Sequence, residues 1–275
     1  MSLDDVSHGL ASVGLDAPST IIGMEVFGID PAPGNPTTIY TNNGWRERRS
    51  GTLKREMAEI EALENVLICW DAPLTGPRSV ALGDSSALRQ GDLTQREIET
   101  FFRKEKNNPW HPPKGISTCG YAGLQHWTIS RHMLGLPRVG PYDQTKDLPF
   151  QLVTANARPT TGKWVVEVHP ALAIWLWCRN EPEFPREPEG WVYKKSVKIS
   201  SKIWEILANK HLEIFNHEAP PQNDDQLDAA VAYALGKLWI TGSPSVAVLG
   251  NRDTGAILLP WDAGLWDAFH DFTNG

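Results

Sequence analysis

The sequence predicts a mixed α/β fold, in which a five-stranded sheet carries helices on both faces. Three observations predict it. Three strand-like segments follow one another early in the chain, a helix-like segment separates them from a fourth, and the most regular helical pattern comes late. Three meandering strands, a crossover helix and two further strands together make a mixed sheet. A large insertion after the fourth strand and a C-terminal hairpin complete the prediction.

The first four strands and the crossover helix are expected before the insertion. Residues 21–30 form an apolar strand, and short Asn/Gly turns connect the expected strands 37–42 and 44–52. Apolar side chains recur at helical spacing over 53–63, which predicts an amphipathic helix. Residues 65–71 are continuously apolar, as is typical of a strand buried on both faces.

The insertion is expected over residues 72–162, which are rich in Gly, Pro, Asn and His. Helical pieces are predicted within it near 94–106 and 121–135. The fifth strand, 163–170, follows the insertion, and a helix over 171–178 comes directly after that strand. The sheet is therefore expected to resume only after a long interruption.

The last part of the chain is expected to be mainly helical. A helix is predicted over 193–210, after a Pro/Glu-rich bridge, and 211–216 fits either a short strand or a helix end. Residues 224–242 show the clearest helical pattern, with Asn223 or Asp224 available as a cap. Residues 245–260 predict a hairpin that turns near its centre.

Composition excludes several classes of protein. The 275 residues are 41% hydrophobic with a net charge of −7, which argues against a general nucleic-acid coat, since non-specific affinity depends on Lys and Arg. Three cysteines do not make a disulfide framework. No apolar run would cross a bilayer, and the acidic N-terminus does not resemble a signal peptide. We expect a cytoplasmic protein with a flexible leader (1–20) and one domain (21–275).

Two aspartates end buried strands. Asp30 closes the first strand and Asp71 closes the fourth, and each is followed by a proline-containing turn. Ligands bind beyond the carboxyl ends of strands in open α/β sheets. If the two strands are parallel neighbours, the two carboxylates lie side by side and repel each other unless a cation or a proton intervenes. A single aspartate at a strand end is more often part of a turn.

The late helix supplies two more acids. Asp225 and Asp228 are three residues apart and therefore project from one helix face. Each could instead serve the helix start, where negative charge is favourable. Together with Asp30 and Asp71, however, they form a set of oxygen ligands of the kind that Mg²⁺ and Mn²⁺ prefer. The sequence therefore predicts a shared metal site built from these four residues.

Glu167 and His169 are further candidates for a catalytic or supporting role. They alternate with valines in the fifth strand, so both should point to one face. A charged glutamate in a buried strand needs a partner. It could orient a metal-bound water or a ligand carboxylate, or it could pair with an arginine of the insertion. His169 could equally be a satisfied side chain at the strand end.

Two basic segments could contact phosphates or could simply be solvated charged faces. The first contains Arg46, Arg48, Arg49, Lys54 and Arg55. The second contains Lys194, Lys195, Lys198 and Lys202.

Four short motifs resemble a known family. The opening FGIDPAPG resembles the first strand of RNase H-like nucleases, especially the RuvC-type Holliday-junction resolvases, and NDDQLDAAVAYAL resembles their last helix. With WDAPLTG and VVEVHP, the pattern over about residues 22–262 is similar to the domain of unknown function 429 family, described as predicted RNase H-like nucleases. The resolvases carry Glu on the fourth strand, whereas this chain carries Asp71 at the strand's end.

The resemblance implies an RNase H-like fold and a metal-dependent nuclease. By resemblance, Asp30, Asp71, Asp225 and Asp228 match the acidic ligand set, with Mg²⁺ or Mn²⁺ as the cofactor. It implies a two-metal hydrolysis of phosphodiester bonds, DNA or RNA as the substrate, and a homodimer.

Two other functions stay open at this point. Actin-like and sugar-kinase-like ATPases or phosphotransferases share this core and also begin with a strand-end aspartate, but their Gly-rich phosphate hairpin is disfavoured here by Pro31 and Pro33. The third possibility is a catalytically silent module that keeps the fold and binds nucleic acid or a protein partner.

Overall fold

The computed structural model describes most of the chain outside the N-terminal segment and parts of the insertion. The described residues are 23–75, 96–103, 109–113, 116, 123–136, 148–182, 184, 193–215 and 219–275. The expected leader (1–20) lies outside the described residues, as do parts of the expected insertion.

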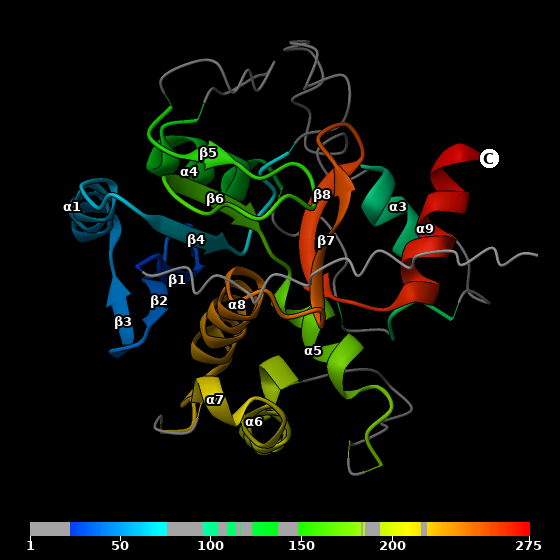
Figure 1. Ribbon diagram of the computed structural model, residues 1–275. Coiled ribbons are helices and arrows are strands. Elements are labelled where there is room, and N and C mark those ends of the chain that lie inside the picture. Colours follow the sequence, from blue (N-terminus) through cyan, green and yellow to red (C-terminus); the bar gives the residue numbers. More distant parts are fainter. Residues whose placement is uncertain are drawn as a thin grey trace, which may run out of the picture.

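The centre of the fold is a six-stranded sheet with the order β3-β2-β1-β4-β6-β5 (Figure 1). Its strands are β1 (Glu25–Asp30), β2 (Thr37–Thr41), β3 (Gly44–Arg48), β4 (Val66–Trp70), β5 (Gln151–Leu152) and β6 (Lys163–Glu167). Strands β1, β2 and β3 pair antiparallel, whereas β1, β4, β6 and β5 pair parallel. The predicted mixed sheet is confirmed, and the sixth strand comes from the end of the expected insertion.

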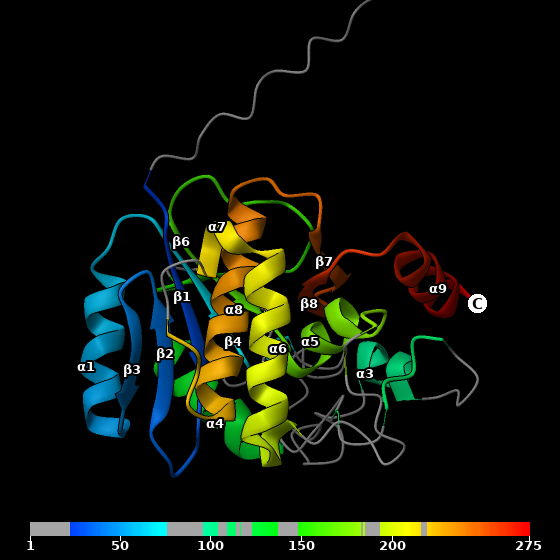
Figure 2. The same cartoon turned by 90° about the horizontal axis from the view of Figure 1, so that it is seen from below.

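Helices cover both faces of this sheet (Figure 2). The helices are α1 (Ser50–Glu61), α3 (Glu97–Arg103), α4 (Gly123–Leu134), α5 (Pro170–Cys178), α6 (Val197–Lys210), α7 (Leu212–Phe215), α8 (Asp224–Ile240) and α9 (Ala263–Asn274). Helices α8, α5 and α6 share one core with the sheet, and α1 and α4 share the core on the opposite face. This arrangement is consistent with the RNase H-like fold that the resemblance implies. Among the described residues, none of the helices combines the length and hydropathy needed to span a membrane.

Successive side chains of β1 point alternately into these two cores. Val26 packs in the core on the α8 face, and Phe27 and Ile29 pack in the core on the α1 face. In β4, Leu67 and Cys69 likewise face α8. The period of two that defines a strand therefore decides which side chains of β1 and β4 can reach α8.

The C-terminal hairpin is also confirmed. Strands β7 (Val246–Asn251) and β8 (Gly255–Pro260) pair antiparallel, and a parallel bridge between Val168 and Leu258 joins β8 to the chain just after β6. Helix α9 was not expected from the sequence. Asp262 caps its first turn, and Phe269 packs against Phe101 of α3 with ring centroids 5.3 Å apart.

Three boundaries differ from the sequence prediction for local reasons. The expected strand 44–52 ends at Arg48, because α1 begins at Ser50. The expected strand 163–170 ends at Glu167, because Pro170 starts α5, a position where its missing N–H group costs nothing. Residues Leu212–Phe215 form a short helix rather than a strand.

Helix α8 lies unusually close to β1 at Gly28. A Cβ atom at this position would lie 2.1 Å from the carbonyl oxygen of Ala229 and 2.4 Å from the backbone nitrogen of Tyr233. Both are backbone atoms of a helix, which cannot rotate away as a side-chain end could. Only glycine therefore permits this distance between helix and strand.

We expect Gly28→Ala to destabilise the protein by about 2–3 kcal/mol or more, because the added methyl group overpacks a rigid contact. The measurement is the free energy of unfolding in urea. Gly51→Ala is the matched control, since Gly51 lies in α1, where an added Cβ atom would have no neighbouring atom within 4 Å, and alanine should increase stability there through its helix propensity. An equal effect of the two substitutions would contradict the close-contact argument.

Candidate functional site

Asp30 and Asp71 lie next to each other at the carboxyl edge of the sheet. Strands β1 and β4 are parallel neighbours, and the N–H of Asp71 donates a hydrogen bond to the carbonyl of Ile29 at 2.9 Å. Ile29 and Trp70 pack in the core on the α1 face. The next residue on each strand, Asp30 or Asp71, therefore faces α8. The sheet itself thus places the first two predicted acids side by side.

The first turn of α8 brings the other two acids to the same edge. Asn223 caps the helix by accepting a hydrogen bond from the N–H of Gln226 at 2.8 Å, and the Trp45 indole donates to the Gln226 carbonyl at 2.8 Å. These bonds hold the helix start against β3. Asp228 is fully buried on the sheet side, whereas Asp225 is partly buried.

The four carboxylates act on one another electrostatically. Burial raises the pKa of Asp30 well above its usual value, and repulsion from Asp71 and Asp228 raises it further. Burial also raises the pKa of Asp71, with Asp228 as the next cause. For Asp225 the causes are burial and then the neighbouring acids, while a hydrogen bond with Asp30 lowers its pKa. The predicted set is therefore one cluster, and it needs a cation or a proton.

A lysine supplies positive charge to this cluster. Asp228 Oδ1 accepts a hydrogen bond of 2.7 Å from the Tyr193 hydroxyl, and Asp228 Oδ2 lies 2.9 Å from Lys194 Nζ. Lys194 also lowers the pKa of Asp30, Asp71 and Asp225. The sequence pattern groups Lys194 with other surface lysines and does not single out Tyr193. Only their position next to the start of a helix distinguishes them in the sequence.

The Lys194 contact is an ion pair without hydrogen-bond geometry. Asp228 Oδ2 is buried and accepts no hydrogen bond from any residue that the structure describes. A buried carboxylate oxygen in this state is costly unless a charge compensates it. Asp228 is therefore the most deeply buried acid of the cluster, and the Lys194 ammonium compensates the charge on its Oδ2.

The chemistry of this donor set fits a hard divalent cation, but the spacing is not that of a preformed metal site. The donors are carboxylate oxygens, which suit Mg²⁺ and Mn²⁺, and one of them, Asp228 Oδ2, accepts no hydrogen bond from a described residue but lies 2.9 Å from Lys194 Nζ. Across the described part of the chain, no group of three or more His, Cys, Asp or Glu side chains has a geometry that could hold a metal ion as it stands. Instead, Asp228 pairs with the ammonium group of Lys194, whose charge also acts on the other three acids.

Glu167 is not among the carboxylates that face α8, although its charge also contributes to the raised pKa of Asp71. It is the register partner of Trp70, and its side chain therefore lies on the opposite face of the sheet from Asp71. There it receives two hydrogen bonds from Arg96, at 2.6 and 2.7 Å, and one from the N–H of Leu74 at 2.8 Å. Arg96 also binds Glu99. The arginine of the insertion that the sequence suggested as a partner is thus present.

His169 has a contact of its own at the start of a helix. It precedes α5 and accepts a hydrogen bond from the N–H of Leu172 on Nδ1 at 3.4 Å, which caps the first turn of that helix. The structure shows a capping contact for His169, and its catalytic role stays a prediction.

The first basic segment is partly neutralised by α1. Arg46 and Arg48 both pair with the buried Glu56, at 3.2 and 2.6 Å. In the second segment, Lys202 lies 3.5 Å from Glu205. These pairs leave fewer positive charges available for phosphates than the sequence suggests. Lys194, in the second segment, instead pairs with Asp228 of the acidic cluster.

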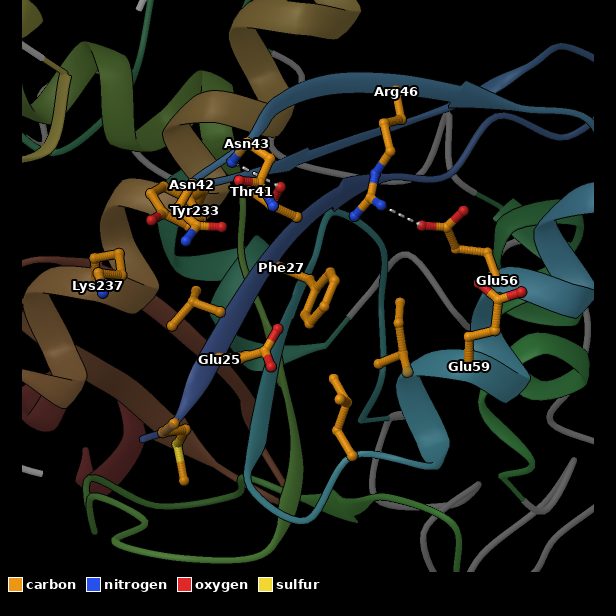
Figure 3. Close-up of a pocket in the computed structure, with 14 residues that line it drawn as sticks. Glu25, Phe27, Thr41, Asn42, Asn43, Arg46, Glu56, Glu59, Tyr233 and Lys237 are labelled. Carbon is orange, nitrogen blue, oxygen red and sulfur yellow. Dashed lines mark hydrogen bonds and ion pairs between the residues drawn. The ribbon is translucent and has the colours of Figure 1, made fainter. Parts of the chain in front are cut away.

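A cavity of about 300 Å³ opens at the other end of β1, away from the acidic cluster (Figure 3). Phe27 lies in its floor, and the Arg46–Glu56 ion pair forms part of its wall. Glu25, at the start of β1, and Tyr233 of α8 also line it. None of the four clustered aspartates lines this cavity, so it is separate from the candidate site.

Comparison with known proteins identifies a family. No curated protein and no solved structure matches this chain. One family model, described as "Protein of unknown function (DUF429)", matches residues 28–251. The matched range begins at the glycine that contacts α8 and includes all four clustered aspartates. The resemblance to the domain of unknown function 429 family is therefore confirmed, and the chain belongs to the DUF429 family.

Proposed function

We propose that the protein is a divalent-metal-dependent nuclease that hydrolyses phosphodiester bonds of DNA or RNA. One observation carries the proposal. Carboxylates from two strand ends and one helix start converge at a single edge of the sheet, although they are far apart in the sequence. Like charges gathered in this way destabilise a protein. Their convergence is expected where the acids serve to bind cations.

The roles of the residues follow from their positions. Asp30, Asp71, Asp225 and Asp228 would hold Mg²⁺ or Mn²⁺, which would activate water and neutralise charge on the departing oxygen. The Tyr193 hydroxyl fixes the orientation of Asp228 through Oδ1, so that Oδ2, which lies 2.9 Å from Lys194 Nζ, is the oxygen that a metal ion would contact. Strands β1 and β4 hold the other two carboxylates on a rigid element, as a catalytic site requires.

The loop after β1 argues against the ATPase alternative. A phosphate-binding hairpin needs free backbone N–H groups. Three of the six residues in this loop (31–36) are prolines, which have no N–H. The N–H of Ala32 donates to Thr37 Oγ1 and the N–H of Asn35 donates to the carbonyl of Ala32. Little donor capacity is left for a nucleotide phosphate.

A catalytically silent binding module is the second candidate, and the Lys194–Asp228 ion pair favours it. An ammonium group that already compensates the acids could replace a cation permanently. The two candidates differ in a simple respect: a nuclease turns over substrate when metal is supplied, whereas a silent module binds without turnover.

The test is an assay of the purified protein on branched DNA, RNA–DNA hybrids and single strands, with and without Mn²⁺. We expect cleavage of at least one substrate, its loss on chelation and its return when Mn²⁺ or Mg²⁺ is added again, because the acids alone cannot stabilise an anionic transition state. Tight binding to a nucleic acid without cleavage at any metal concentration would favour the silent module. Cleavage that persists in chelator would contradict the proposed mechanism.

A further inference from the structure

Lys194 differs from the surface lysines around it in where its ammonium group lies. It belongs to a short 3-10 helix, Tyr193–Lys195, directly before α6. Its Nζ is 2.9 Å from a carboxylate oxygen whose side chain is only 1% exposed, while the lysine side chain is 39% exposed. The lysine therefore reaches from solvent into the acidic cluster.

The two side chains that contact Asp228, Tyr193 and Lys194, differ in how firmly they are held. Tyr193 is buried, and its carbonyl accepts a hydrogen bond of 2.9 Å from the Ser200 hydroxyl, which fixes it to α6. The lysine has a flexible four-carbon side chain and an open path to solvent. If the ammonium left, Asp228 would keep its orientation through the tyrosine, and its second oxygen would be free for another cation.

Lys194 also acts on the rest of the cluster. Its positive charge opposes the repulsion at Asp30, Asp71 and Asp225, and three separate carboxylates therefore respond to one ammonium group. A divalent ion bound by the same acids would lie close to this ammonium, and two cations at such a distance repel each other. The negative charge of the acids can therefore be compensated by the lysine or by the metal ion, but not fully by both at once.

We propose that Lys194 is an internal counter-ion that competes with the divalent cation, so that metal binding displaces its ammonium group from Asp228. This inference rests on the proposed function, because it takes the four acids to be the metal site. It explains why Asp228 pairs with an ammonium group and why the described acids are not in a geometry ready for a metal ion. Lys194 thus sets the metal concentration at which the site fills.

The test compares Mn²⁺ binding to the wild-type protein and to Lys194→Met by titration calorimetry, without substrate. Methionine keeps an unbranched apolar chain and removes the charge. We expect the dissociation constant for Mn²⁺ to fall by about tenfold, because the competing cation is gone. Lys194→Arg, which keeps the charge, should stay near the wild-type affinity. Lys198→Met is the matched control, since Lys198 is exposed on the adjacent helix.

A second measurement, thermal unfolding, distinguishes a change in metal affinity from misfolding of the variant. Without metal, Lys194→Met should have a lower thermal midpoint than the wild type, and Mn²⁺ should raise that midpoint more in the variant than in the wild type. If the wild type binds Mn²⁺ and cleaves nucleic acid while Lys194→Met binds no more tightly than Lys198→Met, the competition is wrong and the nuclease proposal survives. If no form of the protein binds Mn²⁺, both proposals are wrong.

Discussion

Asp30→Asn is expected to lower the turnover of nucleic acid by about 10²-fold or more, since a bound metal supplies several kcal/mol of transition-state stabilisation and 1.36 kcal/mol is worth tenfold in rate. Asparagine has nearly the same shape as aspartate, and its amide N–H group can donate the hydrogen bond that the Asp225 carboxylate accepts from Asp30. The loss would therefore report the missing charge rather than a rearranged site.

The same substitution is expected to raise the thermal midpoint of the metal-free protein. Burial and the neighbouring carboxylates raise the pKa of Asp30, so the folded state binds its proton more tightly than the unfolded state does. The resulting cost to stability is absent below the usual aspartate pKa of about 3.9. It grows as the pH rises and is complete above the raised pKa. The gain from Asp30→Asn should therefore be seen at neutral pH and disappear near pH 3.

Thermal unfolding in chelator at several pH values, together with steady-state rates in Mn²⁺, measures both effects. Asp267→Asn is the control, because Asp267 is exposed on α9 and is not among the groups that shift the pKa of Asp30, Asp71 or Asp225. It should change neither rate nor midpoint substantially. Activity that survives the double substitution of Asp30 and Asp228 by Asn would refute the assignment of the site.

Arg96→Met is expected to lower the free energy of unfolding by about 3–5 kcal/mol, the usual cost of leaving a buried charge without its partner. Arg96 lies between Glu99 and Glu167, and both of these acids are buried. Its Nη1 also donates to the carbonyl of Thr75 at 2.8 Å. The network thus joins α3 and β6 to the segment that follows β4.

Urea unfolding of Arg96→Met measures this effect. Arg252→Met is the matched control, because Arg252 forms an ion pair with Asp253 in which both side chains are nearly half exposed. Such a surface pair contributes little, and its loss should change stability by less than about 0.5 kcal/mol. Similar losses in the two variants would show that the Arg96 network does not stabilise the fold as a buried unit.

Much of the fold could be predicted from local patterns. A continuous apolar run marks β4, a helical period marks α1 and α8, and turn residues mark the hairpin β7–β8, because each of these signals lies within a few neighbouring residues. Asp30 and Asp71 could be paired in advance for the same reason: each ends an apolar run, and parallel neighbours end at one edge. Helix α9 escaped prediction because its apolar residues find their partners on α3, far away in the sequence.

Which residues lie in the acidic site is decided by contacts between distant segments of the chain, and no local sequence pattern records these contacts. Glu167 ends β6 much as Asp30 ends β1, but its side chain lies on the opposite face of the sheet and binds Arg96. Lys194 resembles its neighbouring lysines in the sequence, and only the packing of α6 brings it to Asp228. Residue type and periodicity act over one or two turns of chain. Which charges finally meet is decided by how closely helices and strands approach one another, as α8 does at Gly28.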